Sequence, residues 1–369
     1  MASIKLKGDT SGELTIQAPS VAGTNTLDLP ASSGTLLTTT GNGSQLTGLP
    51  NSYAGTKNLI INGNMQIAQR GTSLTGVTSG NNFVADRFMW QVGTAGTWTM
   101  TQDTDVPSGQ GFANSMKLAC TTANASLSAG SYGVFAHRFE GQNLQQLKKG
   151  TSNAEKVTVS FWIKSNKTGT YQSNLRDVEN TRLIGYEFTI NSADTWEKKI
   201  ITFDGDTSGA IDNDNNLSLQ WEIWFVAGSI YSGSGSVPTA WEATDNTDRY
   251  ANPTINLADS TSNYVNITGV QLEVGTTATD FENLQYGQQL ALCQRYYERY
   301  TGSFYMPVVA GNAVAASGFR VTKRAAPTVS YTSTGGSVSA VNPTTDAVSF
   351  TLYGSTTISI NTWTATSEL

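Results

Sequence analysis

The sequence has few of the residues on which most active sites depend. Of its 369 residues only 14% are charged, and it contains one histidine, His137, and two cysteines, Cys120 and Cys293. A Ser-His-Asp or Cys-His site would have to use His137, and no group of cysteine and histidine has the spacing of a zinc site. Neither a Walker sequence nor a dinucleotide-binding fingerprint is present. We therefore expect a protein that is not an enzyme.

Other absences restrict the cellular context. The formal charge is −6, and the few basic residues occur in isolated pairs, which argues against a nucleic-acid partner. Two cysteines so far apart predict free, buried thiols rather than a disulfide framework. No apolar run approaches the ~18 residues that would span a bilayer, and residues 1–5 contain no hydrophobic signal core. We expect synthesis in the cytoplasm without export by a signal peptide.

What the sequence does contain is typical of a mostly β protein. Glycine, serine, threonine and asparagine are abundant, and Thr, Val, Ile and aromatic residues alternate in short runs bounded by turn residues. The clearest predicted strands cover residues 157–163, 184–190, 199–203, 217–226 and 264–274. Because no helical segments alternate with these strands, the region 58–283 is predicted to be one antiparallel sandwich of the jelly-roll type.

The segments on either side of this region differ in pattern. Residues 1–50 contain four very short strand candidates, at 4–6, 14–16, 27–29 and 35–37, too short to form a stable sheet alone. They could do so by pairing with other chains. Residues 51–57 are predicted to be a linker.

A helix and a further β region follow the sandwich. Residues 284–300 are predicted to form a connecting helix on which Leu290, Cys293, Tyr297 and Tyr300 share one face. That face could cover the sandwich of its own chain or contact another subunit. Residues 301–369 are predicted to be a small C-terminal β domain, because residues 347–353 and 357–361 alternate cleanly.

Two tryptophans are out of phase with the core residues of their strands. In residues 157–163 the apolar set occupies one face and Trp162 the other, and in residues 217–225 Trp224 shares the polar face with Gln220 and Glu222. An indole ring covers the apolar C–H patches of a sugar while polar neighbours bind its hydroxyls. These four residues are therefore candidate glycan ligands. Packing against another domain or subunit explains the same pattern equally well.

Carboxylates offer two further hypotheses. The run Asp204, Asp206, Asp212 and Asp214 could bind Ca²⁺ through oxygen ligands, although solvated loop turns explain it as well and the EF-hand spacing is absent. Glycan hydrolysis needs only two carboxylates. Candidates are Glu187, Glu222, Glu242 and Asp245, but nothing in their spacing defines a pair.

Several stretches resemble a known family. They are residues 57–71 (KNLIINGNMQIAQRG), 85–88 (ADRF), 269–275 (GVQLEVG), 278–282 (ATDFE), 290–297 (LALCQRYY) and 321–329 (VTKRAAPTV). Together they resemble tail fibre and related virion proteins of bacteriophages, particularly cyanophages. The region between them resembles a carbohydrate-binding-module jelly roll, and residues 8–19 resemble the short virion-attachment segment of such proteins.

The resemblance implies a homotrimeric tail fibre that is assembled in the host cytoplasm. Its N-terminal segment would join other tail or baseplate proteins, and its distal part would recognise a host cell-surface polysaccharide. The alternatives are a structural component of the baseplate, collar or head without a ligand of its own, and a glycan-degrading tailspike. Tailspikes usually show long β-helix repeats, and the sequence has no such period.

Overall fold

The computed structural model describes residues 3–7, 11–17, 57–307, 311–354 and 357–369. The chain divides into two units, residues 1–49 and 50–369. In the first unit β1 (Ser3–Lys7) and β2 (Glu13–Gln17) pair as an antiparallel hairpin, at two of the four predicted positions. The predicted strands at 27–29 and 35–37, and linker residues 51–56, lie outside the described residues.

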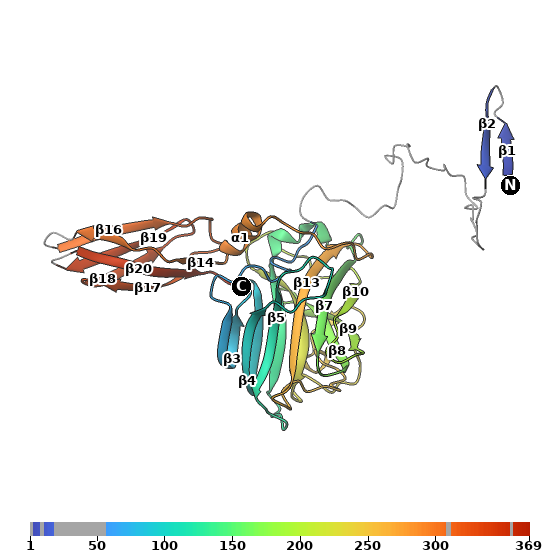
Figure 1. Cartoon of the computed structure of the whole chain (residues 1–369), viewed down its shortest axis with the longest axis horizontal. Helices are drawn as coiled ribbons and strands as arrows, with labels where there is room; N and C mark the ends of the chain where they lie inside the picture. The colour runs from blue at the N-terminus through green and yellow to red at the C-terminus, as the bar shows by residue number, and fades with distance from the viewer. Residues whose placement is uncertain (1–2, 8–10, 18–56, 308–310, 355–356) are drawn as a thin grey trace. The chain divides into compact units, whose positions relative to one another are not determined.

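The second unit begins with a large antiparallel β sandwich, shown in Figure 1. Its strands are β3 (Ser73–Phe83), β4 (Phe88–Asp103), β5 (Ser115–Thr122), β6 (Tyr132–Glu140), β7 (Val157–Ser165), β8 (Gly169–Asp177), β9 (Arg182–Ile190), β10 (Glu197–Phe203), β11 (Leu217–Ala227), β12 (Glu242–Ala243) and β13 (Tyr264–Val274). The predicted mostly-β fold with a central antiparallel sandwich is confirmed, and all five predicted strands are present.

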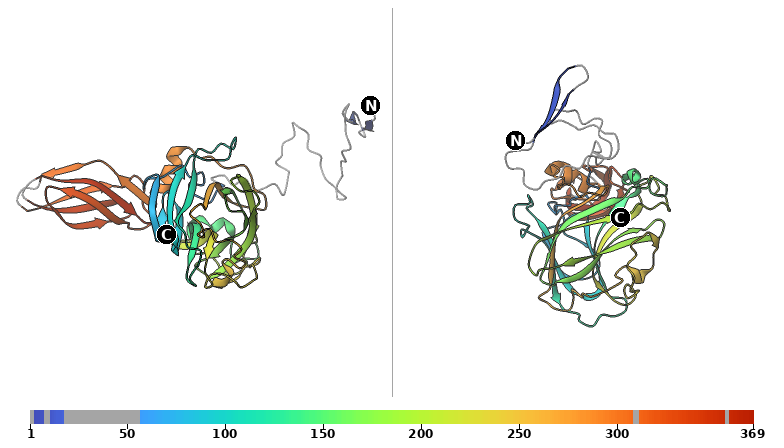
Figure 2. Two further views of the ribbon diagram at one scale, coloured as in Figure 1. Left: turned by 60° about the horizontal axis from the view of Figure 1, so that its bottom comes forward. Right: turned by 90° about the vertical axis from the view of Figure 1, so that its right-hand side faces the viewer.

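The sandwich has two layers because β4 belongs to both of them. Its first half, Phe88–Gly93, pairs with β6, and its second half, Thr97–Asp103, pairs with β5. Between the halves the strand turns through Gly96, whose φ is +79° and where a Cβ would lie 2.3 Å from a backbone carbonyl oxygen, so only glycine fits. One layer, which we call the β7 layer, has the order β10-β7-β13-β5-β4, and the other, the β11 layer, has the order β4-β6-β11-β8-β9-β12. Figure 2 shows the two layers from other directions.

The core lies between the layers and is rich in aromatic rings. Phe161 of β7 and Trp221 of β11 face each other with ring centroids 5.6 Å apart. On both strands the alternate residues predicted to be apolar and internal are buried in this core, from Val157 to Ile163 and from Leu219 to Phe225. The period of two therefore also fixes which side chains of each strand point outward.

One described helix and two small sheets follow the sandwich. The helix α1 covers Tyr286–Gln294. The sheets are built from β14 (Tyr297–Tyr300), β15 (Phe304–Pro307), β16 (Gly311–Gly318), β17 (Thr328–Thr334), β18 (Ser337–Pro343), β19 (Ala347–Gly354) and β20 (Thr357–Thr366). Their orders are β14-β20-β15, with β17 also on β20, and β16-β19-β18. The predicted C-terminal alternation is confirmed, because Val348, Phe350 and Leu352 are buried together.

The helix is shorter than predicted. Leu290 and Cys293 lie on α1, but Tyr297 and Tyr300 belong to β14, which pairs with β20. The four residues therefore do not share one helical face. The run after Gln294 is rich in tyrosine, a residue favoured in strands, and its pairing with β20 prevails over the helical spacing.

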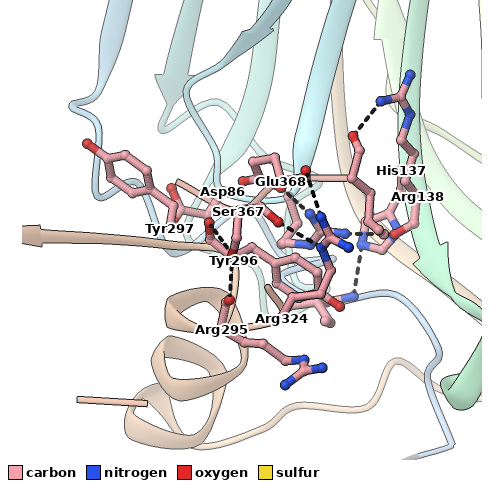
Figure 3. Close-up of polar contacts among 12 residues, drawn as sticks. Asp86, His137, Arg138, Arg295, Tyr296, Tyr297, Arg324, Ser367 and Glu368 are labelled. Carbon is pink, nitrogen blue, oxygen red and sulfur yellow. Dashed lines mark hydrogen bonds and ion pairs between the residues drawn. The ribbon is translucent and has the colours of Figure 1, made fainter. Parts of the chain in front are cut away.

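The end of β20 is joined to the sandwich by buried polar contacts, shown in Figure 3. Glu368 forms ion pairs with Arg87 and Arg70, and Arg70 also pairs with Asp86. The Ser367 amide donates to the carbonyl of Tyr296 at 2.7 Å. Burial raises the pKa of Asp86 to about 6, although Arg70 and the Gln69 side chain oppose this. In this cluster the charged groups have partners within the protein.

Both cysteines are free and buried, as predicted. Within the described part of the chain, no helix is long and apolar enough to span a membrane.

Candidate functional site

The outer face of the β11 layer carries a small polar cavity. The chain between β11 and β13 folds back over this face, and the cavity of about 170 Å³ lies beneath it. We call it the Arg176 pocket. It is lined by Gln91, Tyr132, Val134, Arg176, Trp224, Tyr231 and Arg249. The volume is below the range of about 300–1,000 Å³ found for drug-sized ligand sites, so it suits one sugar-sized group rather than a chain.

The floor of the pocket is held by the buried carboxylate of Glu222. Arg249 donates two hydrogen bonds to it, at 3.2 and 2.7 Å. Asn174, Gln220 and the Trp224 indole N–H donate at 3.1, 2.8 and 2.8 Å. Complete burial alone would raise the pKa of Glu222, but Arg249 outweighs it and the pKa is about 2. Glu222 is thus a charged structural anchor that positions Arg249 and Trp224.

Three aromatic rings form one wall of the pocket. The Trp224 and Tyr231 centroids lie 5.4 Å apart, and Tyr132 meets Tyr231 edge-on at 5.6 Å. The Arg249 guanidinium lies 4.6 Å from the centroid of the Trp224 ring. Tyr132 lies directly on Gly93, where a Cβ would come within 2.5 Å of its ring. Glycine at this position therefore allows the tyrosine to lie against the sheet.

Several polar groups of the pocket are left without protein partners. Arg176 is half-buried, and among the described residues its guanidinium has no hydrogen bond or ion pair. The hydroxyls of Tyr132 and Tyr231 likewise have no hydrogen-bond partner in that part of the chain. An arginine and two tyrosines whose polar groups lack partners among the described residues thus line one concavity with an aromatic wall, which is the arrangement of a binding site for a polar ligand.

The structure corrects the predicted role of the three residues on β11. Gln220, Glu222 and Trp224 do share the outer face, as the alternation predicted. However, Trp224 is only 1% exposed and Glu222 is 0% exposed. The side-chain oxygen of Gln220 accepts a hydrogen bond from Arg138 at 2.9 Å, and its amide nitrogen donates to Glu222. These residues support the pocket rather than offering free binding groups, because the segment after β11 covers them.

Trp162 lies on the opposite side of the sandwich. It is on the outer face of the β7 layer, opposite Lys198 of β10 and Thr268 of β13. Trp162 and Trp224 therefore cannot contact the same small ligand. Nearby, Lys164 pairs with Asp105, and Lys117 lies 3.6 Å from Asp103. Lys164 and Lys117 thus have acidic partners within the protein, in contrast to Arg176.

The four aspartates proposed for Ca²⁺ are not gathered into a site. Asp206 is held by Lys149 at 2.9 Å and by two hydrogen bonds from Arg182, and Asp204 pairs with Lys156 at 2.6 Å. Asp214 accepts from its neighbour Asn216, and Asp212 forms no cluster with the others. Over the described ranges, no group of three or more acidic, histidine or cysteine side chains could hold a metal ion. Lys149, Arg182 and Lys156 thus occupy the carboxylate oxygens of Asp206 and Asp204.

The groups considered for catalysis are also dispersed. His137 is buried and accepts a hydrogen bond from the Ile61 amide at 3.3 Å, and burial lowers its pKa well below the usual value. Glu187 accepts from Asn252 at 3.0 Å on the surface. Burial, followed by the neighbouring Asp248, raises the pKa of Glu242, and Asp245 caps its own turn. None of these residues lines the Arg176 pocket.

The pocket residues that the sequence analysis missed come from two kinds of segment. Tyr132 lies on β6 and Arg176 on β8. Because successive side chains of a strand point to opposite faces, their outward orientation could have been predicted once the two strands were recognised. Residues 169–177 are too polar to be recognised as a strand. Tyr231 and Arg249 lie in the irregular connection after β11, where no periodicity predicts orientation.

Comparison with known proteins gives only distant similarities. No protein-family model matches the chain, and no curated protein sequence matches it. Among solved structures, the enzymatically active domain of tailspike protein 4 of bacteriophage CBA120 is similar with a TM-score of 0.30 and 11% identity, covering 59% of this chain and 21% of that one. A family 11 carbohydrate-binding module from Clostridium thermocellum, solved with a mixed-linked tetrasaccharide, has a TM-score of 0.27 and 13% identity, covering 57% and 99%. A xylan-binding domain of family 22 has a TM-score of 0.28 and 10% identity, covering 57% and 98%. TM-scores this low identify neither a shared function nor a shared site.

Proposed function

We propose that the chain is a subunit of a bacteriophage tail fibre and that its Arg176 pocket binds a glycan on the host cell surface. The observation that carries the proposal is the convergence of unengaged polar groups and aromatic rings in one concavity. Tyr132 and Tyr231 line the pocket with aromatic rings, against which the apolar C–H patches of a sugar would pack. Their hydroxyls and the Arg176 guanidinium remain available to bind sugar hydroxyls.

The pocket is suited to binding without cleavage. Hydrolysis of a glycosidic bond generally requires two carboxyl groups beside the bond. In the part of the chain that the structure describes, no carboxylate lines the pocket, and Glu222 beneath it is bound by Arg249 and three further donors. The proposed function is therefore recognition rather than degradation.

Assembly would compensate for weak binding at a single small pocket. In the proposed fibre three chains associate, the N-terminal segment joins tail or baseplate proteins, and the pockets face the host. Several linked weak sites give an avidity far above that of one site. Sedimentation of the purified chain should therefore give the mass of a trimer, and a single monomer mass would contradict this part of the proposal.

Adsorption to cells tests the binding function. The Tyr132→Ala/Tyr231→Ala double variant should lose adsorption of the purified chain to host cells, because it removes the aromatic wall. Tyr286→Ala is the matched control, since Tyr286 is an exposed tyrosine on α1 outside the pocket, and it should adsorb normally. Normal adsorption of the double variant, with folding confirmed by circular dichroism, would reject the pocket as the receptor site.

A purely structural virion component is the second candidate from the sequence resemblance. It would show no adsorption to cells in any variant, and disruption of the chain would instead prevent particle assembly. Release of reducing sugar from host polysaccharide would favour the tailspike alternative.

A further inference from the structure

The charges in the Arg176 pocket do not balance. Two arginines, Arg176 and Arg249, line it, and no carboxylate of the described residues does. The carboxylate of Glu222 beneath them is bound by both arms of the Arg249 guanidinium. Arg249 is thereby paired. Glu222 also attracts Arg176 through its charge, but among the described residues no hydrogen bond or ion pair joins the two, so Arg176 has no anion in contact with it.

Arg176 is kept in this position by the sheet. On β8 it lies opposite Gln220 of β11 and Leu183 of β9, so both neighbouring strands fix its backbone. The side chain is half-buried, and burial, followed by the charge of Arg249, lowers its pKa. Its N–H groups have no partner among the described residues, and an anion or a strong acceptor in the pocket would pair with them in place of water.

The neighbouring cations show how the protein treats such groups elsewhere. Arg138 donates to Gln220 and to the backbone carbonyl of Leu369. Arg182 donates two hydrogen bonds to Asp206. On the opposite face Lys164 pairs with Asp105. Arg176 differs from all three because it lines the pocket and its guanidinium has no hydrogen-bond or ion-pair partner among the described residues.

We propose that the pocket selects a sugar residue that carries an anionic group, a carboxylate or a sulfate, and that Arg176 binds this group. This inference rests on the proposed glycan-binding function and adds the chemical class of the ligand. A planar guanidinium matches such an anion through two parallel N–H···O hydrogen bonds. The ring of the same sugar would lie against Tyr132 and Tyr231, which line the pocket.

The test compares polymers that differ only in charge. The full chain is titrated with polygalacturonate and its methyl ester, and with dextran sulfate and dextran, and binding is followed by calorimetry. We expect one of the charged polymers to bind at least about tenfold more tightly than its neutral counterpart, as for a charge-assisted hydrogen bond. Preference for polygalacturonate identifies a carboxylate ligand, and preference for dextran sulfate identifies a sulfate ligand.

Variants assign the preference to Arg176. R176Q should remove the difference between charged and neutral polymers, and R176K should retain part of it, because lysine keeps the charge but loses the planar pair of donors. K198Q is the matched control, since Lys198 is an exposed cation on the other layer of the sandwich, and it should behave as wild type. Raising the salt concentration should weaken wild-type binding and leave the residual binding of R176Q almost unchanged.

Three outcomes overturn the inference: equal binding of charged and neutral polymers by wild type, an unchanged preference in folded R176Q, or no binding to either charged polymer. If R176Q does not fold, R176K decides the question: a partial loss of the preference supports the inference, and an unchanged preference overturns it. The proposed function is judged separately by the adsorption of the Tyr132→Ala/Tyr231→Ala variant. Loss of adsorption in that variant, together with normal adsorption of R176Q, would retain the glycan-binding function and reject the anionic ligand.

Discussion

Trp162 on β7 and Trp224 on β11 occupy equivalent positions in the sequence pattern, because each points away from the core of the sandwich. The surfaces around them nevertheless differ. Around Trp224 a returning segment brings Tyr231 and Arg249 over the sheet and encloses a cavity. Around Trp162 the neighbouring residues are Lys198 and Thr268, and the Arg176 pocket does not extend to this side.

The contrast shows that the alternation along a strand predicts which way a side chain points, but not which residues will surround it. Whether an outward tryptophan becomes a surface residue or the wall of a pocket depends on the connections that cross the sheet. The ion pairs of the two layers also differ in how deeply they are buried. On the β7 layer Lys164 is paired with the partly exposed Asp105, whereas on the β11 layer Arg249 is paired with the fully buried Glu222.

The largest predicted difference between the two faces is in stability. Glu222→Gln leaves Arg249 buried without its counter-charge and should lower the free energy of unfolding by about 3–5 kcal/mol. Asp105→Asn removes an ion pair whose aspartate is 42% exposed and should cost about 1 kcal/mol or less. Denaturant unfolding followed by tryptophan fluorescence measures both. Similar losses in the two variants would contradict the assigned difference in environment.

The next largest predicted effect is the pH dependence of the contribution that Glu222 makes to the free energy of unfolding. The pKa of Glu222 is about 2 in the folded chain, against an ordinary value of 4.5. Its stabilising contribution should therefore be complete above about pH 4.5 and be lost as the pH falls through 2, by about 3 kcal/mol in total. The difference in unfolding free energy between wild type and Glu222→Gln, measured from pH 7 to pH 2.5, should narrow only in the acid range. A difference that narrows already between pH 7 and pH 5 would disprove the low pKa.

Replacement of each tryptophan by phenylalanine should give the smallest difference. Trp224→Phe removes the indole N–H that Glu222 accepts, together with buried ring area, and should cost about 2 kcal/mol. Trp162→Phe should change stability by only about 0.5 kcal/mol, since its side chain is partly exposed and the phenyl ring retains most of the contact. Thermal unfolding of the two variants compares them directly, and equal shifts in melting temperature would not fit the structure.

Much of the fold was predictable from the sequence, because successive side chains of a strand point to opposite faces of the sheet and a half-buried strand therefore alternates apolar and polar residues. Residues 157–163 and 217–226 show one apolar face each, and both are strands whose apolar faces meet in the core. The helix boundary was less predictable. Tyr297 and Tyr300 fit a helical spacing, and only the pairing of β14 with β20 decides against it.

The site could be predicted only in part. Gln220, Glu222 and Trp224 were recognised as a group because they alternate on one strand, but their burial depends on a connection without periodicity. Arg249 acquires its role through a contact with Glu222, 27 residues away in the sequence. No local pattern encodes a contact of this kind. That Arg176 lacks a partner among the described residues likewise becomes evident only from the positions of the neighbouring side chains in the structure.

The central claim is that ligand binds at the β11 layer and not at the β7 layer. Hydrogen–deuterium exchange of the full chain, with and without polysaccharide from cells to which it adsorbs, tests this most directly. We predict slower exchange in residues 228–251, which cover the Arg176 pocket, and no change in residues 191–202, beside Trp162. Slower exchange confined to residues 191–202 would contradict the account and place the ligand on the opposite face.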